Sequence, residues 1–275
     1  MFLSFNGKIL DSSKPIFLAD NRGFRYADGL FETMRMEDGQ IRLLELHYDR
    51  LFSSMEQLDI VLPKLYNQHF ISEQILQLAA KNNCTNSARI RLTVSNGNGG
   101  IFEKNQKADL LIECWPLPKS IAELNENGLV LGIYSDARKP LDFISSLKTL
   151  NAIQYSLAAR FAEENHLNDA VLLNANGSIA DTTIANIFII KNGVIATPSL
   201  DQGCVSGVMR RFLLENLPKK GFQIIEKEIV IADLLDADEV FLTNAVRELK
   251  WVKEINGKYF SNSIIKKIRE VLFSQ

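Results

Sequence analysis

The chain has 275 residues, 46% of them hydrophobic and 23% charged, which is enough to bury the core of one large or two modest domains. Lys and Arg total 31 against 33 Asp and Glu, and the resulting net charge of −2 excludes an overall basic field that would collect nucleic acid or an anionic membrane. Because no apolar run reaches the roughly 18 residues of a spanning helix and the N-terminus turns polar too early for a secretory signal, we expect a cytoplasmic protein.

Two hairpins followed by two helices are predicted at the start of the chain. Asn6-Gly7 separates FLSF from KIL, and Asp38-Gly39 separates FETMRM from QIRLL, as tight two-residue turns prefer. The apolar faces of the two helices are Leu44, Leu51, Met55 and Leu58, and Phe70, Ile71, Ile75 and Leu78. The alternating run 88–95 then indicates a half-buried strand, with the run 109–115 as its neighbour.

A domain boundary is expected after these strands, because two prolines and then polar residues interrupt the pattern in PLPKSIAELNENG. We therefore divide the chain into an N-terminal α/β domain of residues 1–117, an interdomain linker of residues 118–127 and a C-terminal domain of residues 128–275.

Strands outnumber helices in the C-terminal half. The patterns predict strand 129–135, a polar loop over 136–147, helix 149–164, strands 169–174 and 178–182, a hairpin over 187–197, helix 208–217, strands 222–229 and 238–243, and a hairpin over 249–260. Short turns connect most of these strands. This arrangement favours an α+β fold class with a barrel-like C-terminal domain over a doubly wound sheet.

Three positions in this half have the residue types that pyridoxal 5'-phosphate requires from a protein. Lys148 lies near a helix entrance, where a partly desolvated amine can form an imine, although an isolated lysine is usually a solvated surface charge. Asp181 lies in a strand-like run and could pair with the protonated ring nitrogen, or it could be a turn or cap residue. Gly207 precedes a helix whose first N–H groups, at Val208 and Met209, could bind a phosphate, or it could simply cap that helix.

Other side chains could complete a cofactor site. The turn at Asn244 and Ala245 follows a predicted strand and could donate further N–H groups. Arg50, on the polar face of the first helix, could supply a charge-assisted hydrogen bond. Asn186 could orient Asp181 or its strand, although an Asn before a strand is more often a turn residue.

Four cations are candidates for binding substrate carboxylates, and each is at least as well explained as a solvated surface charge: Arg89, Arg91, Arg138 and Lys139. Motifs of other enzyme classes are absent from the sequence, among them GxxxxGK(S/T), GxSxG and HExxH. The three cysteines have no CxxC spacing and form no cluster with the three histidines, so we expect neither a disulfide framework nor a metal site.

Ordered blocks over nearly the whole chain resemble the class IV, fold type IV pyridoxal-phosphate enzymes, a family that contains branched-chain aminotransferases, D-amino acid aminotransferases and aminodeoxychorismate lyases. The blocks are FNGKI, YADGLFETMR, HYDRLFSSMEQL, LKTLN, ADTTIANIFII, VSGVMRRF and FLTNAVREL. Within the family, TPSLDQGCVSGVMRRF and TNAV are most similar to the lyases, whereas Phe31-Glu32 is similar to the aminotransferases.

The resemblance implies a two-domain fold of the D-amino acid aminotransferase type, pyridoxal phosphate as cofactor, an amino-acid-like substrate and a homodimer. It also implies site roles: Lys148 as the Schiff-base lysine, Asp181 as the acid at the ring nitrogen, Arg50 on the phosphate, Val208, Met209, Asn244 and Ala245 as the phosphate-binding backbone, and Phe31 near the substrate. Asp181 is one methylene shorter than the usual glutamate, so it would lie closer to the ring or act through water.

The activity expected from the resemblance is that of an aminodeoxychorismate lyase, which forms 4-aminobenzoate and pyruvate for folate synthesis. Two alternatives stay open: an aminotransferase of branched-chain or D-amino acids, and a non-catalytic protein that has kept the scaffold to bind a small molecule.

Overall fold

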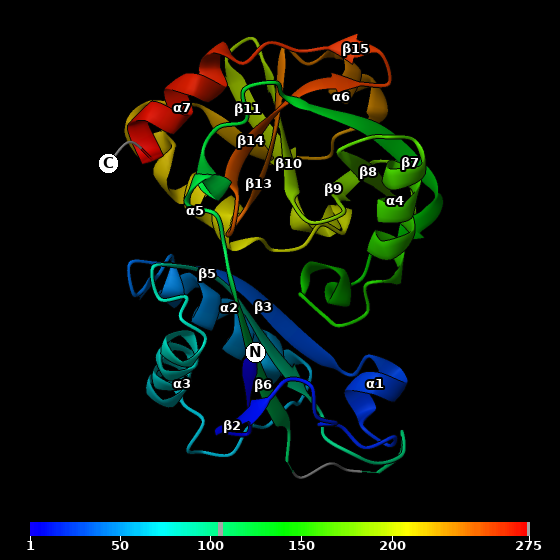
Figure 1. Ribbon diagram of the computed structural model, residues 1–275. Coiled ribbons are helices and arrows are strands. Elements are labelled where there is room, and N and C mark those ends of the chain that lie inside the picture. Colours follow the sequence, from blue (N-terminus) through cyan, green and yellow to red (C-terminus); the bar gives the residue numbers. More distant parts are fainter. Residues whose placement is uncertain (104–106, 274–275) are drawn as a thin grey trace. The chain divides into compact units, whose positions relative to one another are not determined.

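The computed structural model describes residues 1–103 and 107–273 and divides the chain into two compact units (Figure 1). The first unit comprises Met1–Ile121 together with Lys148–Asn151, and the second comprises Ala122–Leu147 together with Ala152–Gln275. Within the described residues, no helix has both the length and the apolar character needed to cross a membrane.

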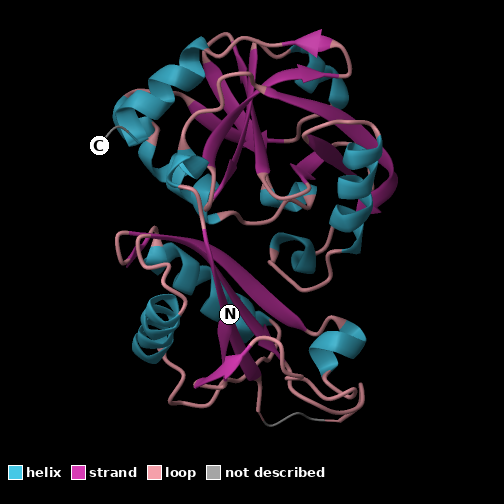
Figure 2. Ribbon diagram, viewed as in Figure 1, coloured by secondary structure: helices cyan, strands magenta, loops and turns pink. Residues whose placement is uncertain are grey.

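The first unit contains a six-stranded antiparallel sheet (Figure 2). Its strands are β1 (Phe2–Phe5), β2 (Lys8–Asp11), β3 (Gly29–Glu37), β4 (Gln40–Ile41), β5 (Ser87–Ser95) and β6 (Asp109–Pro116), in the spatial order β2-β1-β6-β5-β3-β4. Both predicted hairpins are confirmed, since β1 pairs with β2 and β3 with β4. All four turn residues have positive φ, which Asn, Asp and Gly tolerate.

Helices pack on the buried face of this sheet. Helix α2 (Leu44–Gln57) contacts β3, and α3 (Gln68–Lys81) contacts β1 and β6. The predicted alternation in β5 is confirmed, because its buried face consists of Ala88, Ile90, Leu92 and Val94. The short helix α1 (Arg22–Tyr26), which Asn21 caps, has too few residues to produce an apolar period and is not among the predicted elements.

The second unit contains a curled sheet of nine strands. They are β7 (Leu129–Lys139), β8 (Asp169–Asn174), β9 (Ile179–Thr182), β10 (Asn186–Lys191), β11 (Val194–Pro198), β12 (Ile224–Lys227), β13 (Glu239–Asn244), β14 (Glu248–Ile255) and β15 (Lys258–Tyr259). The path runs β12-β11-β10-β13-β14-β7-β8-β9, and its last strand, β9, also contacts β10 and β11. This return contact curls the sheet on itself and confirms the predicted barrel-like domain and the α+β class.

Apolar side chains fill both faces of the curled sheet. Residues that alternate along its strands, such as Ile187 and Ile189 of β10, form an inner core that α6 (Ile231–Asp236) completes with Leu234. The intervening residues, such as Phe188, lie in an outer cluster with residues of α5 (Val208–Asn216) and α7 (Ser263–Phe273). Helix α4 (Ile153–Glu164) covers another part of the outer face through Ala158. Short 3₁₀ turns occur at Lys119–Ala122, Phe143–Ser146, Leu200–Gln202 and Pro218–Lys220.

Several predicted elements of the second half are wrong in extent. The helix predicted over 149–164 begins only at Ile153, because residues 148–151 form backbone hydrogen bonds with the β3 region instead. The loop predicted from residue 136 starts after Lys139, because β7 continues beside β8. The strand predicted over 222–229 is limited to Ile224–Lys227. Helices α6 and α7 are not among the predicted elements.

Candidate active site

Lys148 lies in a segment that the first unit holds through its backbone. Phe31 N–H donates to the carbonyl oxygen of Lys148, and Leu150 N–H donates to that of Gly29, both at 2.9 Å. Nζ of Lys148 lies 4.4 Å from the centroid of the Phe31 ring, within cation–π distance. These backbone hydrogen bonds therefore fix the position of the Lys148 backbone, so that its long side chain starts beside the Phe31 ring.

Arg91 approaches the same ring from β5. Its guanidinium carbon lies 3.9 Å from the Phe31 centroid, and its partner across the ladder on β6 is Glu113. Burial lowers the pKa of Arg91 and raises the pKa of Glu113, although the charge of each residue opposes the shift of the other. Arg89 instead lies 5.7 Å from the ring of Trp115. The structure thus brings Lys148, Phe31 and Arg91 together and places Arg89 next to Trp115.

A buried carboxylate, Glu32, lies on the opposite face of β3. Arg50 of α2 donates to it from two nitrogens, Nε to Oε1 at 2.7 Å and Nη2 to Oε2 at 2.5 Å, and His47 Nδ1 lies 2.6 Å from Oε2. Burial alone would raise the pKa of Glu32, but the charge of Arg50 and the hydrogen bonds from both partners lower this pKa to about 2. Burial lowers the pKa of His47, so a neutral imidazole donates Nδ1–H to Glu32. The structure therefore places Arg50, predicted at the phosphate, in an ion pair with Glu32.

Asp181 is the buried acid of the second unit, on β9. Its Oδ2 accepts hydrogen bonds from the Tyr155 hydroxyl at 3.0 Å, from Val205 N–H at 3.1 Å and from Lys139 Nζ at 3.2 Å. Its Oδ1 is also buried but has no hydrogen-bond partner among the described residues. Because a buried acceptor without a donor is costly, Oδ1 is suited to a donor supplied from outside the chain.

Gly207 allows the start of β10 and the N-terminus of α5 to meet. A Cβ atom at this position would lie 1.8 Å from Asn186 Oδ1, while Asn186 Nδ2 donates to the Val205 carbonyl at 2.8 Å. Gly207 is the N-cap of α5, and no described side chain caps this helix. The N–H groups of Val208 and Met209 belong to the first turn, where a helix leaves donors without intrahelical partners at its positive end.

The turn at Asn244 and Ala245 lies at the same end of the sheet. Asn186 of β10 pairs with Thr243, the residue before Asn244, across the ladder to β13. Oδ1 of Asn244 accepts N–H groups from two later residues of the turn, at 3.0 and 2.8 Å, so this side chain shapes the turn. The structure thus gathers Asn186, Gly207 and the Asn244 turn at one edge of the second unit.

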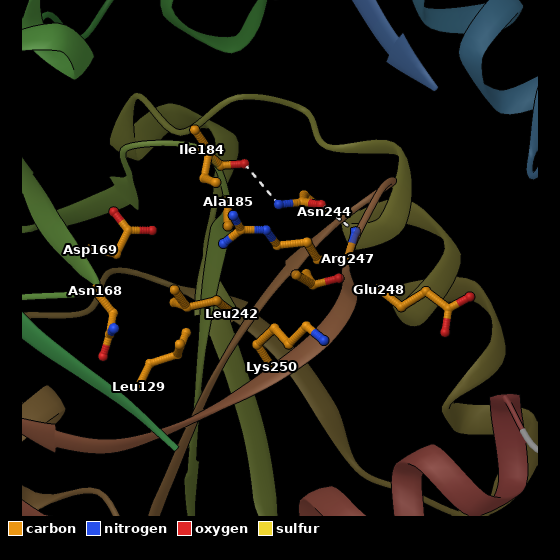
Figure 3. Close-up of a pocket in the computed structure, with 11 residues that line it drawn as sticks. Leu129, Asn168, Asp169, Ile184, Ala185, Leu242, Asn244, Arg247, Glu248 and Lys250 are labelled. Carbon is orange, nitrogen blue, oxygen red and sulfur yellow. Dashed lines mark hydrogen bonds between the residues drawn. The ribbon is translucent and has the colours of Figure 1, made fainter. Parts of the chain in front are cut away.

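A pocket opens beside this turn, and Figure 3 shows the residues that line it. Asn244 Nδ2 donates to the Ile184 carbonyl at 3.3 Å across it. Lys250 also lines the pocket, and its pKa is lowered to about 8, chiefly by burial and then by the charges of two nearby arginines. Apart from Asn244, none of the predicted cofactor residues lines this pocket.

Two of the cations predicted to bind substrate, Arg138 and Lys139, lie in the second unit and make different contacts. Arg138 Nη1 donates to the Asn174 carbonyl at 3.4 Å, at the turn between β8 and β9. Its neighbour Lys139 pairs instead with Asp181. Sequence reasoning did not single out Tyr155, because an aromatic residue in an amphipathic helix is typical of a core and nothing local indicates what its hydroxyl contacts.

The residues present fit the cofactor that the sequence predicts. Oδ1 of Asp181 is a buried acceptor that a protonated ring nitrogen would satisfy. Gly207 keeps the first turn of α5 free of a side chain at its cap, as a phosphate at a helix N-terminus requires.

Comparisons with known proteins agree with this chemistry. Residues 29–255 match the family model described as amino-transferase class IV. The chain is 32% identical over 278 residues to a candidate branched-chain-amino-acid aminotransferase of Methanocaldococcus jannaschii, covering 98% of this chain and 94% of that protein. It is 30% identical over 248 residues to the aminodeoxychorismate lyase of Bacillus subtilis, covering 89% of this chain and 83% of that protein.

A solved structure confirms the predicted architecture. The branched-chain aminotransferase of Thermoproteus uzoniensis, crystallised with norvaline, matches this chain with a TM-score of 0.87 at 23% identity, covering 98% of this chain and 93% of that one. The likeness extends over the whole fold, as expected for fold type IV.

Proposed function

Because the chain belongs to the class IV aminotransferase family, whose members are enzymes of pyridoxal 5'-phosphate chemistry, we propose that it is an aminodeoxychorismate lyase. The cofactor assignment for this chain depends chiefly on the buried Oδ1 of Asp181, an acceptor that lacks a donor among the described residues. The choice of the lyase is supported by the segments TPSLDQGCVSGVMRRF and TNAV and by the similarity to the Bacillus enzyme.

Lys148 and Asp181 carry the chemistry in this proposal. Bound pyridoxal phosphate supplies an aldehyde for the amine and a ring that accepts the electron pair of the breaking C–H bond. Lys148 would hold the cofactor through its amine, and the same amine would take the proton from the substrate carbon as a general base. Asp181 would accept a hydrogen bond from the ring N–H through Oδ1, which receives none from the described residues. Loss of pyruvate then leaves the aromatic ring of 4-aminobenzoate, so the reaction needs no second substrate.

The phosphate is held by backbone donors in this proposal. The N–H groups of Val208 and Met209 lie at the positive end of α5 and suit a doubly charged anion. The Asn244 and Ala245 turn adds donors from the same edge of the sheet. Asn186 acts indirectly, because it packs against Gly207 and sets where α5 begins. For Arg50, the two-point contact with Glu32 fixes the plane of the guanidinium.

Among the cations predicted for substrate carboxylates, Arg91 is the strongest candidate. It is partly desolvated and lies against Phe31, the ring that the Lys148 amine also approaches. A carboxylate of the substrate would relieve the cost of burying the guanidinium. Arg89 and Arg138 have weaker support, since they lie against Trp115 and the Asn174 carbonyl.

The test of the lyase uses the cofactor-loaded protein and aminodeoxychorismate with no keto acid present. We expect 4-aminobenzoate and pyruvate in equal amounts, and a loss of at least about a thousandfold in rate for Lys148→Ala, since the imine-forming base is removed. Lys191→Ala, which removes a surface lysine, is the matched control and should keep full activity. Absence of the aromatic product, in a protein that binds the cofactor, would exclude the lyase.

An aminotransferase is the second candidate, because the Methanocaldococcus relative at 32% identity covers nearly the whole chain. In that reaction Lys148 would both take and deliver the proton, and hydrolysis by water would release the keto acid. Mixing the loaded protein with branched-chain amino acids or with D-alanine distinguishes the two. Bleaching of the cofactor band with release of a keto acid, and no 4-aminobenzoate from aminodeoxychorismate, would favour this candidate.

We also propose that the enzyme is a homodimer, as its resemblance to the family implies. Light scattering of the purified protein should give twice the mass of the chain, and a monomer that turns over at the full rate would contradict the proposal.

A further inference from the structure

Lys139 is a buried cation at the end of β7, and its side chain is 6% exposed. Its Nζ lies 3.2 Å from Asp181 Oδ2, 2.5 Å from the Tyr155 hydroxyl and 3.5 Å from the Ser145 carbonyl oxygen. A lysine this deeply buried is rarely found in proteins unless a counter-charge accompanies it. Asp181 is that counter-charge.

The contacts around Asp181 are asymmetric. Lys139, Tyr155 and the Val205 N–H all donate to Oδ2, whereas Oδ1 receives no hydrogen bond from the described residues. Burial and the charge of Asp181 raise the pKa of Tyr155 well above its ordinary value, so this hydroxyl stays protonated. Three donors on one oxygen fix the plane of the carboxylate and the direction of the other oxygen.

We propose that Lys139 is a positioning residue for the cofactor. The carboxylate of Asp181 and the ring nitrogen share one proton, and Lys139 acts through Asp181 to keep that proton on the nitrogen. The inference rests on the proposed role of Asp181 at that nitrogen. It assigns Lys139 no contact with the substrate.

Elementary electrostatics gives the direction of the effect. A carboxylate and a pyridine nitrogen joined by one hydrogen bond share a proton that can lie on either partner. A cation in contact with Oδ2 is closer to the carboxylate than to a nitrogen bound at Oδ1, so it stabilises the state with a charged carboxylate and a protonated nitrogen. Without this cation the buried carboxylate loses its counter-charge and retains the proton itself.

The remaining ionisable neighbours do not replace Lys139. Cys204 lies near Asp181, and burial raises its pKa to about 11, so it is a neutral thiol at pH 7. Arg210, which influences Cys204, is engaged by Glu226 and by the Pro198 carbonyl. Of the cations in the described part of the chain, Lys139 is the one that forms an ion pair with Asp181.

The test is a direct reading of the ring nitrogen in the loaded protein. The protein is prepared with pyridoxal phosphate labelled with nitrogen-15 in the ring, and the nitrogen chemical shift is recorded at pH 7. The wild type should give the shift of a protonated ring nitrogen, and Lys139→Met should move it toward the unprotonated value. Lys139→Arg should restore the wild-type shift, because it keeps the charge. Lys191→Met, the same change at a surface lysine, should leave the shift unchanged.

A double substitution shows whether Lys139 acts through the acid. In an Asp181→Asn background, Lys139→Met should produce no further change in the nitrogen shift, because the partner on which it acts is already neutral. If Lys139→Met fails to fold, Tyr155→Phe removes a second donor to the same oxygen and should move the shift in the same direction by a smaller amount.

The outcomes separate this inference from the proposed function. An unchanged nitrogen shift in Lys139→Met, or additive effects of the two substitutions, would overturn the role of Lys139 while leaving the lyase intact. A wild-type protein that binds pyridoxal phosphate without any dependence on Lys148 would instead refute the proposed function.

Discussion

Glu32 and Asp181 are two buried carboxylates whose surroundings differ. Glu32 has donors on both oxygens, from Arg50 and His47, whereas the described residues donate to only one oxygen of Asp181. A carboxylate that is saturated by protein donors stabilises the fold, and one that keeps an oxygen without a donor is suited to a ligand. The same residue chemistry therefore serves structure in the first unit and, in our proposal, cofactor binding in the second.

Glu32 should contribute a pH-dependent part of the stability. Its pKa falls from an ordinary 4.5 to about 2 on folding, which corresponds to roughly 3 kcal/mol. A lowered folded pKa means that this contribution is complete above about pH 4.5 and is lost as the pH falls toward 2. Glu32→Gln should therefore lower the free energy of unfolding by about 3 kcal/mol at pH 7, measured by urea unfolding, and this difference should narrow below pH 4.5.

The control for this prediction is Glu215→Gln, which breaks an exposed ion pair with Arg211 on α5. Its effect should stay below about 0.5 kcal/mol at every pH. Equal effects of the two substitutions at pH 7 would show that the Glu32 pair does not stabilise the protein.

For single residues, the sequence indicates which side chains could have a role in the site better than it indicates which side chains contact each other. The proposed roles of Lys148 and Asp181 follow from local pattern and resemblance, and they stay predictions until the cofactor is measured. The contact between Lys139 and Asp181 joins residues 42 positions apart, and that between Tyr155 and Asp181 joins residues 26 apart. No periodicity within one segment contains that information, so the sequence alone groups Lys139 with the substrate cations.

At the scale of elements, Gly207 controls how closely α5 approaches β10. Gly207→Ala would place a Cβ atom 1.8 Å from Asn186 Oδ1, so the helix or the asparagine must move. We expect a loss of stability of about 1–3 kcal/mol, as for other overpacked sites, together with weaker binding of pyridoxal phosphate. Thermal unfolding and cofactor titration measure the two effects.

Two comparisons isolate the cause. In an Asn186→Ala background the clash partner is gone, so Gly207→Ala should cost much less stability. Gly221→Ala tests a glycine with φ of 82°, at which an added Cβ atom would meet nothing within 4 Å. Its cost of about 1–2 kcal/mol therefore comes from backbone strain and should leave cofactor affinity unchanged. If Gly207→Ala bound the cofactor as tightly as the wild type, the N-terminus of α5 would not hold the phosphate.

Elements defined by turn chemistry could be predicted from the sequence, and those defined by distant contacts could not. Asn192-Gly193 and Asn256-Gly257 form the tight hairpins expected of them, since all four residues have positive φ. The predicted start of α4 is too early, because the helical pattern includes residues whose backbone bonds the β3 region of the first unit instead. Tertiary hydrogen bonds override a local pattern at such places.

At the scale of the whole molecule, each unit has its own buried apolar core. In the first unit Met34, Ile75 and Ile90 are fully buried, and in the second the curled sheet encloses Ile187 and Val240. The interdomain linker over 118–127 remains a prediction from the sequence. Residues 148–151 belong to the first unit, although the residues on both sides of them belong to the second. Local sequence patterns do not predict this assignment.

Because a ligand that binds only the folded protein stabilises it by mass action, the cofactor should add to the stability of the chain. A ligand at about 100 times its dissociation constant stabilises a protein by about 2.7 kcal/mol, which for a chain of this size raises the melting temperature by roughly 5 °C. Pyridoxal phosphate should produce this shift in the wild type, and Lys148→Ala and Asp181→Asn should each reduce it. Lys191→Ala, at a surface position, should retain the full shift. A full shift in both Lys148→Ala and Asp181→Asn would mean that the cofactor is held by other residues and that the proposed site is wrong.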